Sequence, residues 1–181
     1  MTELSVKDLH EFITNQLSNR VLRLYKSHHI ITEADLQSHV HHMLSSFISK
    51  RESKHGYNKV LNKPFFKELQ LYPDIVIFRN KKPWIIFELK EKKKVNKDKL
   101  QIEYNDFRRE KKHFKSLKRG YLLYVAYRGT GKCQVKPKKE DKGFFYEIPI
   151  VMESKIKSKF KLDKWIDNRK FWAKYAKEKK N

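Results

Sequence analysis

The stretch LYPDIVIFRNKKPWIIFELKEKKK, from Leu71 to Lys94, narrows the choice of fold more than any other part of the chain. It contains two short apolar runs, rich in isoleucine and phenylalanine, on either side of a charged segment. Such runs, bounded by turn residues, are typical of the two strands of an antiparallel hairpin. If the turn between Arg79 and Pro83 closes symmetrically about Lys81, the hairpin also has a defined register.

In that register Asp74 lies directly opposite Glu88, with the two Cβ atoms about 4.5–5.5 Å apart on one face of the sheet. Lys90, two residues after Glu88, projects from the same face because side chains alternate along a strand. The three polar groups therefore converge at one end of the hairpin, and a slip of one residue in register would weaken their pairing. The opposite face is covered by apolar side chains, namely Ile75, Ile77, Ile85, Phe87 and Leu89.

Two carboxylates this close repel each other, and one is driven toward protonation unless a cation lies between them. Lys90 supplies part of that positive charge. A hard divalent cation such as Mg²⁺ supplies it better, because Mg²⁺ takes one or two protein carboxylates together with water and phosphate oxygens. The alternative is a strand that ends in a charged loop, with Glu88 and Lys90 as solvated rim residues. That alternative leaves the pairing of Asp74 with Glu88 unexplained.

The composition points to a polyanionic partner. Lys and Arg number 43 against 21 Asp and Glu, which gives a net charge of +22. An A/T-rich genome also enriches lysine, but it does not by itself suppress acidic residues. The single cysteine, Cys133, excludes an intramolecular disulfide and a cysteine-based zinc site. No apolar run approaches the ~20 residues that span a bilayer, and the amphipathic, acid-containing N-terminus is unlike a signal peptide. We therefore expect an intracellular protein, cytoplasmic in a prokaryote or phage, that does not enter a membrane.

Hydrophobic periodicity predicts an α/β domain with a mixed sheet. Ser5 and Asp8 have the spacing of a capping box, and Thr32 is a candidate N-cap. The run 121–127 is apolar on both faces, as expected of an internal strand, whereas Pro149 suggests an edge strand. The predicted helices cover 5–18, 20–26, 33–50, 97–117 and the segment from Leu162 onward, and the predicted strands cover 64–71, 74–78, 83–89, 121–127 and 144–151.

The hairpin carries a recognisable motif. Pro73-Asp74 on the first strand, followed by Glu88-Leu89-Lys90 on the second, resembles the PD-(D/E)xK motif of the restriction-endonuclease-like nuclease superfamily. The order of predicted elements is similar to the αβββαβ core of that family, in which helices flank a mixed central sheet. The resemblance covers about 32–127, within a single nuclease-like domain of residues 1–181. It leaves a helical extension over 1–31 and a strand with a basic helix over 144–181.

The resemblance implies a site and a cofactor. Asp74, Glu88 and the backbone carbonyl of Leu89 would bind Mg²⁺ or Mn²⁺, and Lys90 would assist the attack of water. Family members often carry a further acid on the preceding helix, where Glu33 falls in this sequence. Asp74, Glu88, Lys90 and Glu33 are then the candidate catalytic residues.

Four further assignments are weaker in the sequence. Glu33 also fits an acid that complements the dipole of its own helix, and Glu68, on the predicted strand 64–71, competes with it as the third acid. Gln37, one turn after Glu33, and Gln101, near the start of the next helix, are candidates for supporting the site. A solvated helix residue is the simpler explanation of each glutamine.

Basic runs flank the motif and suit a protein that holds a nucleic-acid backbone. Taken singly, each run is also typical of a solvated helix face. The candidate nucleic-acid-binding residues are Lys92, Lys93, Lys94, Arg108, Arg109, Lys111 and Lys112.

The sequence thus predicts a metal-dependent nuclease acting on DNA in preference to RNA. Restriction-type, nicking and structure-directed endonucleases all fit, in a defence system or a mobile element, and the restriction-type members would act as homodimers. Two other classes remain open. One is a non-catalytic nucleic-acid-binding protein on the same fold, and the other is a protein whose basic surface docks on an acidic protein partner.

Overall fold

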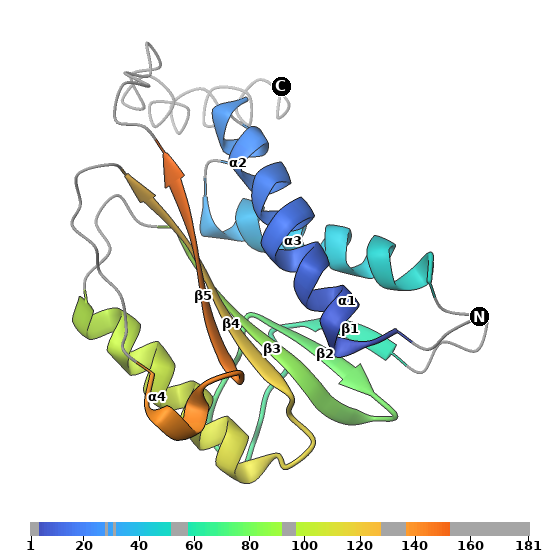
Figure 1. Ribbon diagram of the computed structural model, residues 1–181, viewed down its shortest axis with the longest axis vertical. Coiled ribbons are helices and arrows are strands. Elements are labelled where there is room, and N and C mark those ends of the chain that lie inside the picture. Colours follow the sequence, from blue (N-terminus) through green and yellow to red (C-terminus); the bar gives the residue numbers. More distant parts are fainter. Residues whose placement is uncertain are drawn as a thin grey trace, which may run out of the picture.

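The computed structural model describes residues 4–27, 29–30, 32–51, 58–91, 97–127 and 137–152. These residues form a five-stranded mixed sheet with N-terminal helices on one face and a single long helix, α4, on the other (Figure 1). The protein is therefore an α/β protein, as the sequence predicts. The predicted C-terminal helix from Leu162 lies outside the described residues. None of the described helices combines the length and apolar character needed to cross a bilayer.

The two helices predicted over 5–18 and 20–26 are one continuous helical run. It consists of α1 (Val6–Glu11), a π-helical segment η1 (Phe12–Leu17) and α2 (Ser18–Lys26). The run begins at the predicted capping box, in which the Ser5 hydroxyl accepts from the Asp8 amide at 3.0 Å. The box satisfies amide groups that have no partner within the first turn of a helix.

Helix α3 (Glu33–Ser49) also begins at its predicted cap. The Thr32 hydroxyl accepts from the Asp35 amide at 3.1 Å, and the Asp35 carboxylate accepts from the Thr32 amide at 2.9 Å. The predicted apolar stripe of the helix faces the sheet. Its buried members are Leu36, Val40, Met43 and Leu44, with Phe47 partly buried beside them.

The sheet has the strand order β1-β2-β3-β4-β5, so the strands lie side by side in chain order. β1 (Asn58–Asn62), β2 (Ile75–Arg79) and β3 (Lys82–Glu91) are antiparallel neighbours. β4 (Arg119–Tyr127) is parallel to β3, and β5 (Phe145–Met152) is parallel to β4. Helix α4 (Lys97–His113) makes the crossover from β3 to β4. The strand that contains Pro149 is an edge strand, as predicted.

The prediction of a strand over 64–71 is wrong. This segment is a turn region closed by an isolated bridge between Phe66 and Leu71, and Gln70 adopts a positive φ of 53°. A positive φ interrupts an extended strand. Phe66 is buried on the α4 face of the sheet, so the apolar content of 64–71 serves packing rather than pairing. The first strand is instead β1, whose sequence NKVLN has only two apolar residues and a weak strand signal.

The register predicted for the site end of the hairpin is confirmed, although the turn is tighter than expected. Ile75 pairs with Phe87, as a turn symmetric about Lys81 requires, but Arg79 pairs with Lys82. Asn80 and Lys81 are therefore the two central residues, both with positive φ, as in a primed hairpin turn. A shift in register between Ile77 and Phe78 then leaves one extra residue on β3. This bulge restores the pairing that aligns the start of β2 with the end of β3.

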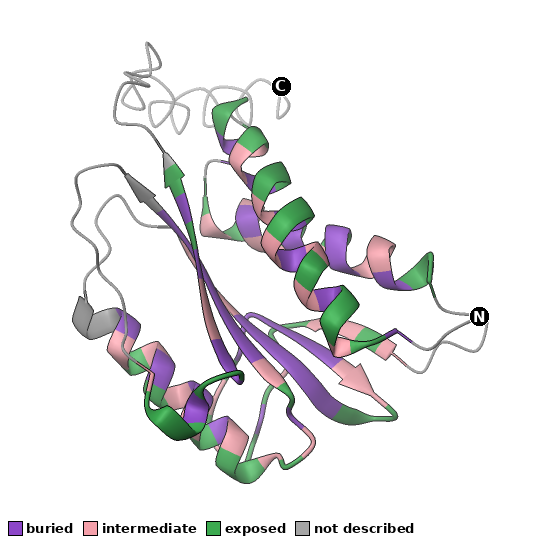
Figure 2. Ribbon diagram, in the orientation of Figure 1, coloured by how far each residue is buried: buried purple, intermediate pink, exposed green. Residues whose placement is uncertain are grey.

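The sheet separates two hydrophobic cores, and its central strands are buried on both faces (Figure 2). The core on the face of the N-terminal helices contains the five hairpin residues that the sequence assigned to one apolar face. The core on the α4 face contains Val76 and Ile86 from the hairpin, together with apolar residues of α4 and β4. Because side chains alternate along β2 and β3, Asp74, Glu88 and Lys90 belong to the α4 face.

Gly120 allows α4 to approach β4 closely. A Cβ atom at this position would lie 2.6 Å from Cδ1 of Phe107, whose ring is buried in the α4 core. We expect Gly120→Ala to lower the free energy of unfolding by about 1–3 kcal/mol, as over-packing usually does. Urea denaturation measures this loss. The double variant Gly120→Ala/Phe107→Leu should lose less free energy of unfolding than the sum of the two single variants. Strict additivity would contradict the steric explanation.

Candidate active site

Asp74 stands immediately before β2 and is held from three directions. Its side-chain Oδ2 accepts from the backbone amide of Leu89 at 2.8 Å. Its backbone carbonyl accepts from the amide of Lys63 at 2.9 Å and from Nε2 of Gln37 at 2.7 Å. The side chain is only 9 % exposed. The carboxylate is therefore fixed between the two hairpin strands, and Gln37 links helix α3 to its backbone.

Glu88 and Lys90 meet this carboxylate on the α4 face of β3. Nζ of Lys90 lies 3.3 Å from Oε2 of Glu88 and 4.0 Å from Oδ2 of Asp74. The side chains of Glu88 and Lys90 are 14 % and 18 % exposed, so the group is close to the surface but shielded from most water. The three residues that the sequence singled out thus form one cluster.

Glu103 is a fourth member that the sequence reasoning missed. It projects from α4, and its Oε1 lies 3.2 Å from Nζ of Lys90. A signal was present, because Glu103 lies between Leu100 and Phe107, three and four residues away, on the apolar stripe of the helix that faces the sheet. An acid within such a stripe needs a partner on the sheet.

The electrostatics of the cluster follow from burial and from the crowding of acids. Burial, reinforced by the negative charge of Asp74, raises the pKa of the Glu88 carboxyl well above its usual range. Burial alone would lower the pKa of Lys90, but the carboxylates of Glu88, Glu103 and Asp74 reverse this effect and raise it. Lys90 therefore keeps its proton, whereas the Glu88 carboxyl holds its proton to a higher pH than an ordinary glutamate does.

A divalent cation fits part of this arrangement. Three carboxylates surround one ammonium, so negative charge remains in excess when all are ionised. Asp74 and Glu88 provide the hard oxygen ligands that Mg²⁺ and Mn²⁺ accept. The N–H and C=O of a strand residue leave the backbone on the same side, so the carbonyl of Leu89 faces the side on which its amide binds Asp74. Across the residues that the structure describes, no three His, Cys, Asp or Glu side chains are grouped as metal ligands. Two carboxylates and one carbonyl would leave the remaining coordination positions of such an ion to water and substrate oxygens.

The remaining predicted site residues differ in their placement. Glu33 is the first residue of α3, one turn before Gln37, and its role as a further acid stays a prediction. Glu68 is exposed in the turn region that replaces the predicted strand. The amide of Gln101 donates to Oδ1 of Asn105 at 3.2 Å, along the surface of α4. Of the two candidate glutamines, Gln37 is the one that forms a hydrogen bond to Asp74.

Most of the α4 residues that were predicted to bind nucleic acid form ion pairs within the protein. Arg108 and Lys111 both bind Asp141 of the 3-10 helix η2 (Lys139–Asp141), at 2.9 and 2.8 Å. Burial alone would raise the pKa of Asp141, but hydrogen bonds from Lys111 and Tyr104, together with the charge of Arg108, lower it. These two cations therefore anchor η2 and the start of β5 to α4.

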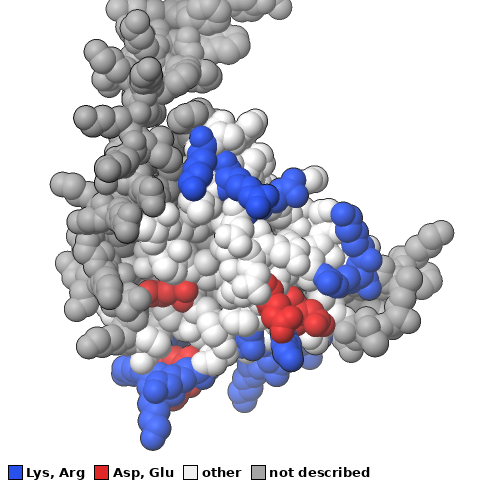
Figure 3. All heavy atoms as spheres, turned by 45° about the horizontal axis from the view of Figure 1, so that its top comes forward, with Lys and Arg blue, Asp and Glu red and all other residues white. Residues whose placement is uncertain are grey.

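The other predicted basic residues are less restrained or lie elsewhere. Arg109 pairs with Asp106 at 3.0 Å and donates to the carbonyl of Leu69 at 3.1 Å, while Lys112 is exposed. Lys92, Lys93 and Lys94 lie outside the described residues. On the face that Figure 3 shows, Lys and Arg side chains stand in several separate groups rather than in one patch.

No family model, no curated protein and no solved structure matches the chain.

Proposed function

We propose that this protein is a metal-dependent nuclease that hydrolyses phosphodiester bonds, with DNA as the preferred substrate. One observation carries the proposal, namely the convergence of Asp74, Glu88 and Lys90 where adjacent strands end on one face of the sheet. The net charge of +22 supports a polyanionic substrate. The chain order α3-β1-β2-β3-α4-β4 supports the finer assignment to a restriction-endonuclease-like αβββαβ core, with added N-terminal helices and β5.

Each residue has a defined task in this proposal. Asp74, Glu88 and the Leu89 carbonyl would hold Mg²⁺ or Mn²⁺, which supplies Lewis-acid polarisation of the phosphate and a bound water of lowered pKa. The hydrogen bond from Leu89 to Asp74 fixes the orientation of that carboxylate before substrate arrives. Lys90 keeps its proton, so it would stabilise the negative charge that develops on the phosphate and orient the attacking water.

A cleavage assay tests the proposal directly. Plasmid, duplex, single-stranded, branched and RNA substrates are incubated with Mg²⁺ or Mn²⁺, and the product ends are mapped. We expect the wild-type protein to cut DNA substrates and Asp74→Asn to lose activity while keeping the shape of the site. Equal cleavage by the two proteins would reject the site assignment, and RNA as the better substrate would reject the DNA preference.

Glu103 is expected to act through Lys90. Glu103→Gln removes the 3.2 Å ion pair that holds the ammonium toward α4, so the pKa of Lys90 should fall and its position should loosen. We expect cleavage to slow on the order of tenfold, which corresponds to about one pKa unit of lost interaction. Because Lys90 keeps its proton in both proteins, the pH–rate profile should keep its shape while the rate falls. Glu140→Gln, on η2, is the matched control and should behave as wild type.

A non-catalytic nucleic-acid-binding protein is the second candidate, and the position of Lys90 favours it. The ammonium lies within about 4 Å of three carboxylates, so the cluster is partly neutralised without a metal. This candidate requires metal-independent binding of nucleic acid, no cleavage of any substrate, and no heat of Mg²⁺ or Mn²⁺ binding by calorimetry.

A further inference from the structure

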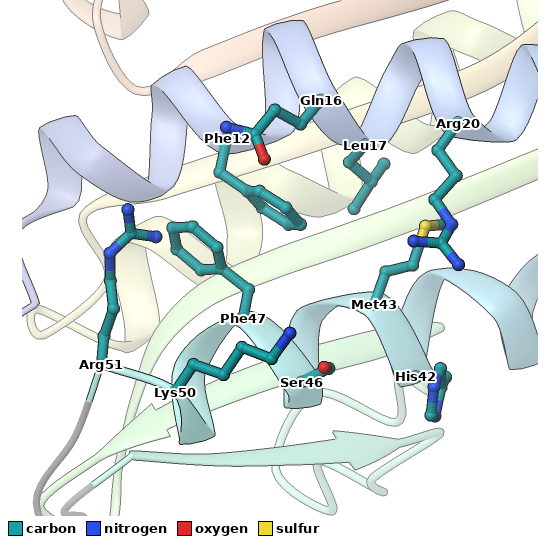
Figure 4. A pocket seen from close by; sticks show the side chains of 10 residues that line it. All are labelled: Phe12, Gln16, Leu17, Arg20, His42, Met43, Ser46, Phe47, Lys50 and Arg51. Carbon is teal, nitrogen blue, oxygen red and sulfur yellow. The ribbon is translucent and has the colours of Figure 1, made fainter.

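A groove of about 660 Å³ lies between the N-terminal helical run and α3, on the face of the sheet opposite the Asp74 cluster. Figure 4 shows its walls, one formed by η1 and the start of α2 and the other by α3. The groove plays no part in the proposed chemistry. Its lining residues are Phe12, Gln16, Leu17, Arg20, His42, Met43, Ser46, Phe47, Lys50 and Arg51.

The described residues that line the groove include cations and no acid. Arg20 stands on one wall, and Lys50 and Arg51 stand on the other, all three exposed. The ten lining residues include no Asp or Glu. Arg51 also acts on Asp8, near the start of α1: hydrogen bonds from Ser5 chiefly lower the pKa of Asp8, and Arg51 adds a smaller electrostatic effect.

Polar hydrogen-bonding groups stand among these cations. His42, Ser46 and Lys50 recur every four residues along α3, so they form one row on the wall of the groove. Eight residues of helix cover about 12 Å, which is the rise of three to four steps of one nucleic-acid strand. Gln16 faces this row from η1 (Figure 4). Cations interspersed with hydroxyl and amide groups are typical of surfaces that contact phosphates.

The aromatic residues in the groove already stack on protein groups. Phe12 and Phe47 stack on each other with ring centroids 3.9 Å apart. The guanidinium of Arg51 lies over the Phe47 ring, 4.0 Å from its centroid. Protein groups thus already occupy the faces of Phe47 on which a base would stack. Phe12 and Phe47 therefore serve packing between the two helices, and the groups left to contact a ligand are the cations and the polar side chains.

We infer that this groove binds the phosphodiester backbone of a nucleic acid, without reading its sequence. Charge complementarity carries the inference, because three cations, with no acid among the described lining residues, match a row of phosphates. The groove goes beyond the proposed cleavage, since its binding needs neither metal nor the Asp74 cluster. It gives the protein a second contact with the polyanion on the other side of the sheet.

The test compares two triple variants that remove the same charge. The groove variant carries Arg20→Gln, Lys50→Gln and Arg51→Gln. The matched control carries Lys59→Gln, Lys81→Gln and Lys82→Gln, three exposed lysines at the far end of the β1–β3 hairpins. Fluorescence anisotropy measures the binding of a labelled duplex and a labelled single strand in EDTA, over a series of salt concentrations.

We expect the groove variant to lose about 100-fold in affinity at 0.1 M salt and the control to lose far less. The slope of log affinity against log salt should fall by about 2–3 in the groove variant. Equal losses in the two variants would overturn the inference, because net charge alone would then explain them. Preferential binding of polyglutamate over both oligonucleotides would also overturn it and would identify an acidic peptide as the occupant.

Two controls keep these outcomes separate from folding and from catalysis. Lys50 and Arg51 lie near the C-terminus of α3, where cations stabilise a helix. Thermal unfolding of both triple variants shows whether the substitutions act by destabilising the fold. If the groove variant unfolds, the single variant Arg20→Gln, outside α3, should still reduce the salt slope by about 0.7–0.9. All binding is measured in EDTA, where metal-dependent cleavage cannot occur, so a failure of the nuclease proposal leaves this measurement intact.

Discussion

Replacing Lys90 by alanine is expected to reduce phosphodiester cleavage by about 10²- to 10⁴-fold while nucleic-acid affinity changes little. The reason is that Nζ of Lys90 lies 3.3 Å from Glu88 and 4.0 Å from Asp74, beside the place where the scissile phosphate would bind. The Lys90 ammonium would therefore stabilise the negative charge that develops on the phosphate during cleavage. The other 42 Lys and Arg residues, which remain in the variant, keep the general attraction for the polyanion.

The measurement separates catalysis from binding. Single-turnover cleavage gives the chemical rate, and anisotropy in EDTA gives the affinity. Lys59→Ala, an exposed lysine on β1, is the control and should match wild type in both. The variant Lys90→Ala should also be less stable than wild type at pH 8 without metal, because three carboxylates lose their shared ammonium, and Mg²⁺ should restore part of that stability. A wild-type cleavage rate in Lys90→Ala would exclude Lys90 from the chemistry.

Binding of Mg²⁺ or Mn²⁺ is expected to release a proton from Glu88, and this is the second large effect. Burial and the nearby Asp74 raise the pKa of Glu88 well above 4.5 in the metal-free protein. A metal ligand must be ionised, so binding removes the proton and apparent affinity rises with pH. Calorimetry in buffers of different ionisation enthalpy counts the released protons. Glu88→Gln should bind metal weakly and release none.

The same raised pKa makes the stability of the metal-free protein depend on pH. A carboxyl whose pKa is higher in the folded state stabilises the fold fully below pH 4.5, and this contribution is lost as pH rises through the folded value. Glu110, which is buried on α4, behaves in the same direction, because burial and then Asp106 raise its pKa to about 8. Comparing Glu88→Gln with Glu110→Gln therefore separates the two contributions.

Metal is expected to change the contribution of Glu88 to stability but not that of Glu110. Added Mg²⁺ should remove the alkaline loss of stability that arises from Glu88 and leave that of Glu110 in place. Thermal unfolding between pH 5 and pH 9, with and without Mg²⁺, gives both contributions. A metal effect that is unchanged in Glu88→Gln, or metal binding that releases no proton in wild type, would contradict the assignment of Glu88 as a ligand.

The hairpin explains how far sequence reasoning reaches. Alternation along β2 and β3 placed Ile75 and Phe87 on one face, and the observed pairing agrees. The turn itself differs, since Asn80 and Lys81 form a two-residue turn that a bulge on β3 offsets. The register at the site was correct because burying one face of the hairpin penalises any slip. The turn geometry depends on local φ values, which the pattern did not specify.

Two failures have a common physical cause. β1 was missed because an edge strand packs on few neighbours and needs few apolar residues, as NKVLN illustrates. The segment 64–71 was assigned to a strand because its apolar residues were counted without their partners. Phe66 packs against Phe114, 4.6 Å away between ring centroids, in the core below α4. Packing between distant segments decided both cases.

The sequence by itself determined the α/β class, the caps at Ser5 and Thr32, and the convergence of Asp74, Glu88 and Lys90, because these depend on periodicity and on spacing within a short stretch. Tertiary structure alone decided which side chains from distant segments come into contact. It brought Glu103 of α4 to Lys90, Gln37 of α3 to the backbone of Asp74, and Asp141 to the basic residues of α4. These contacts join segments far apart in the chain, and their geometry is set by how helices pack on the two faces of the sheet.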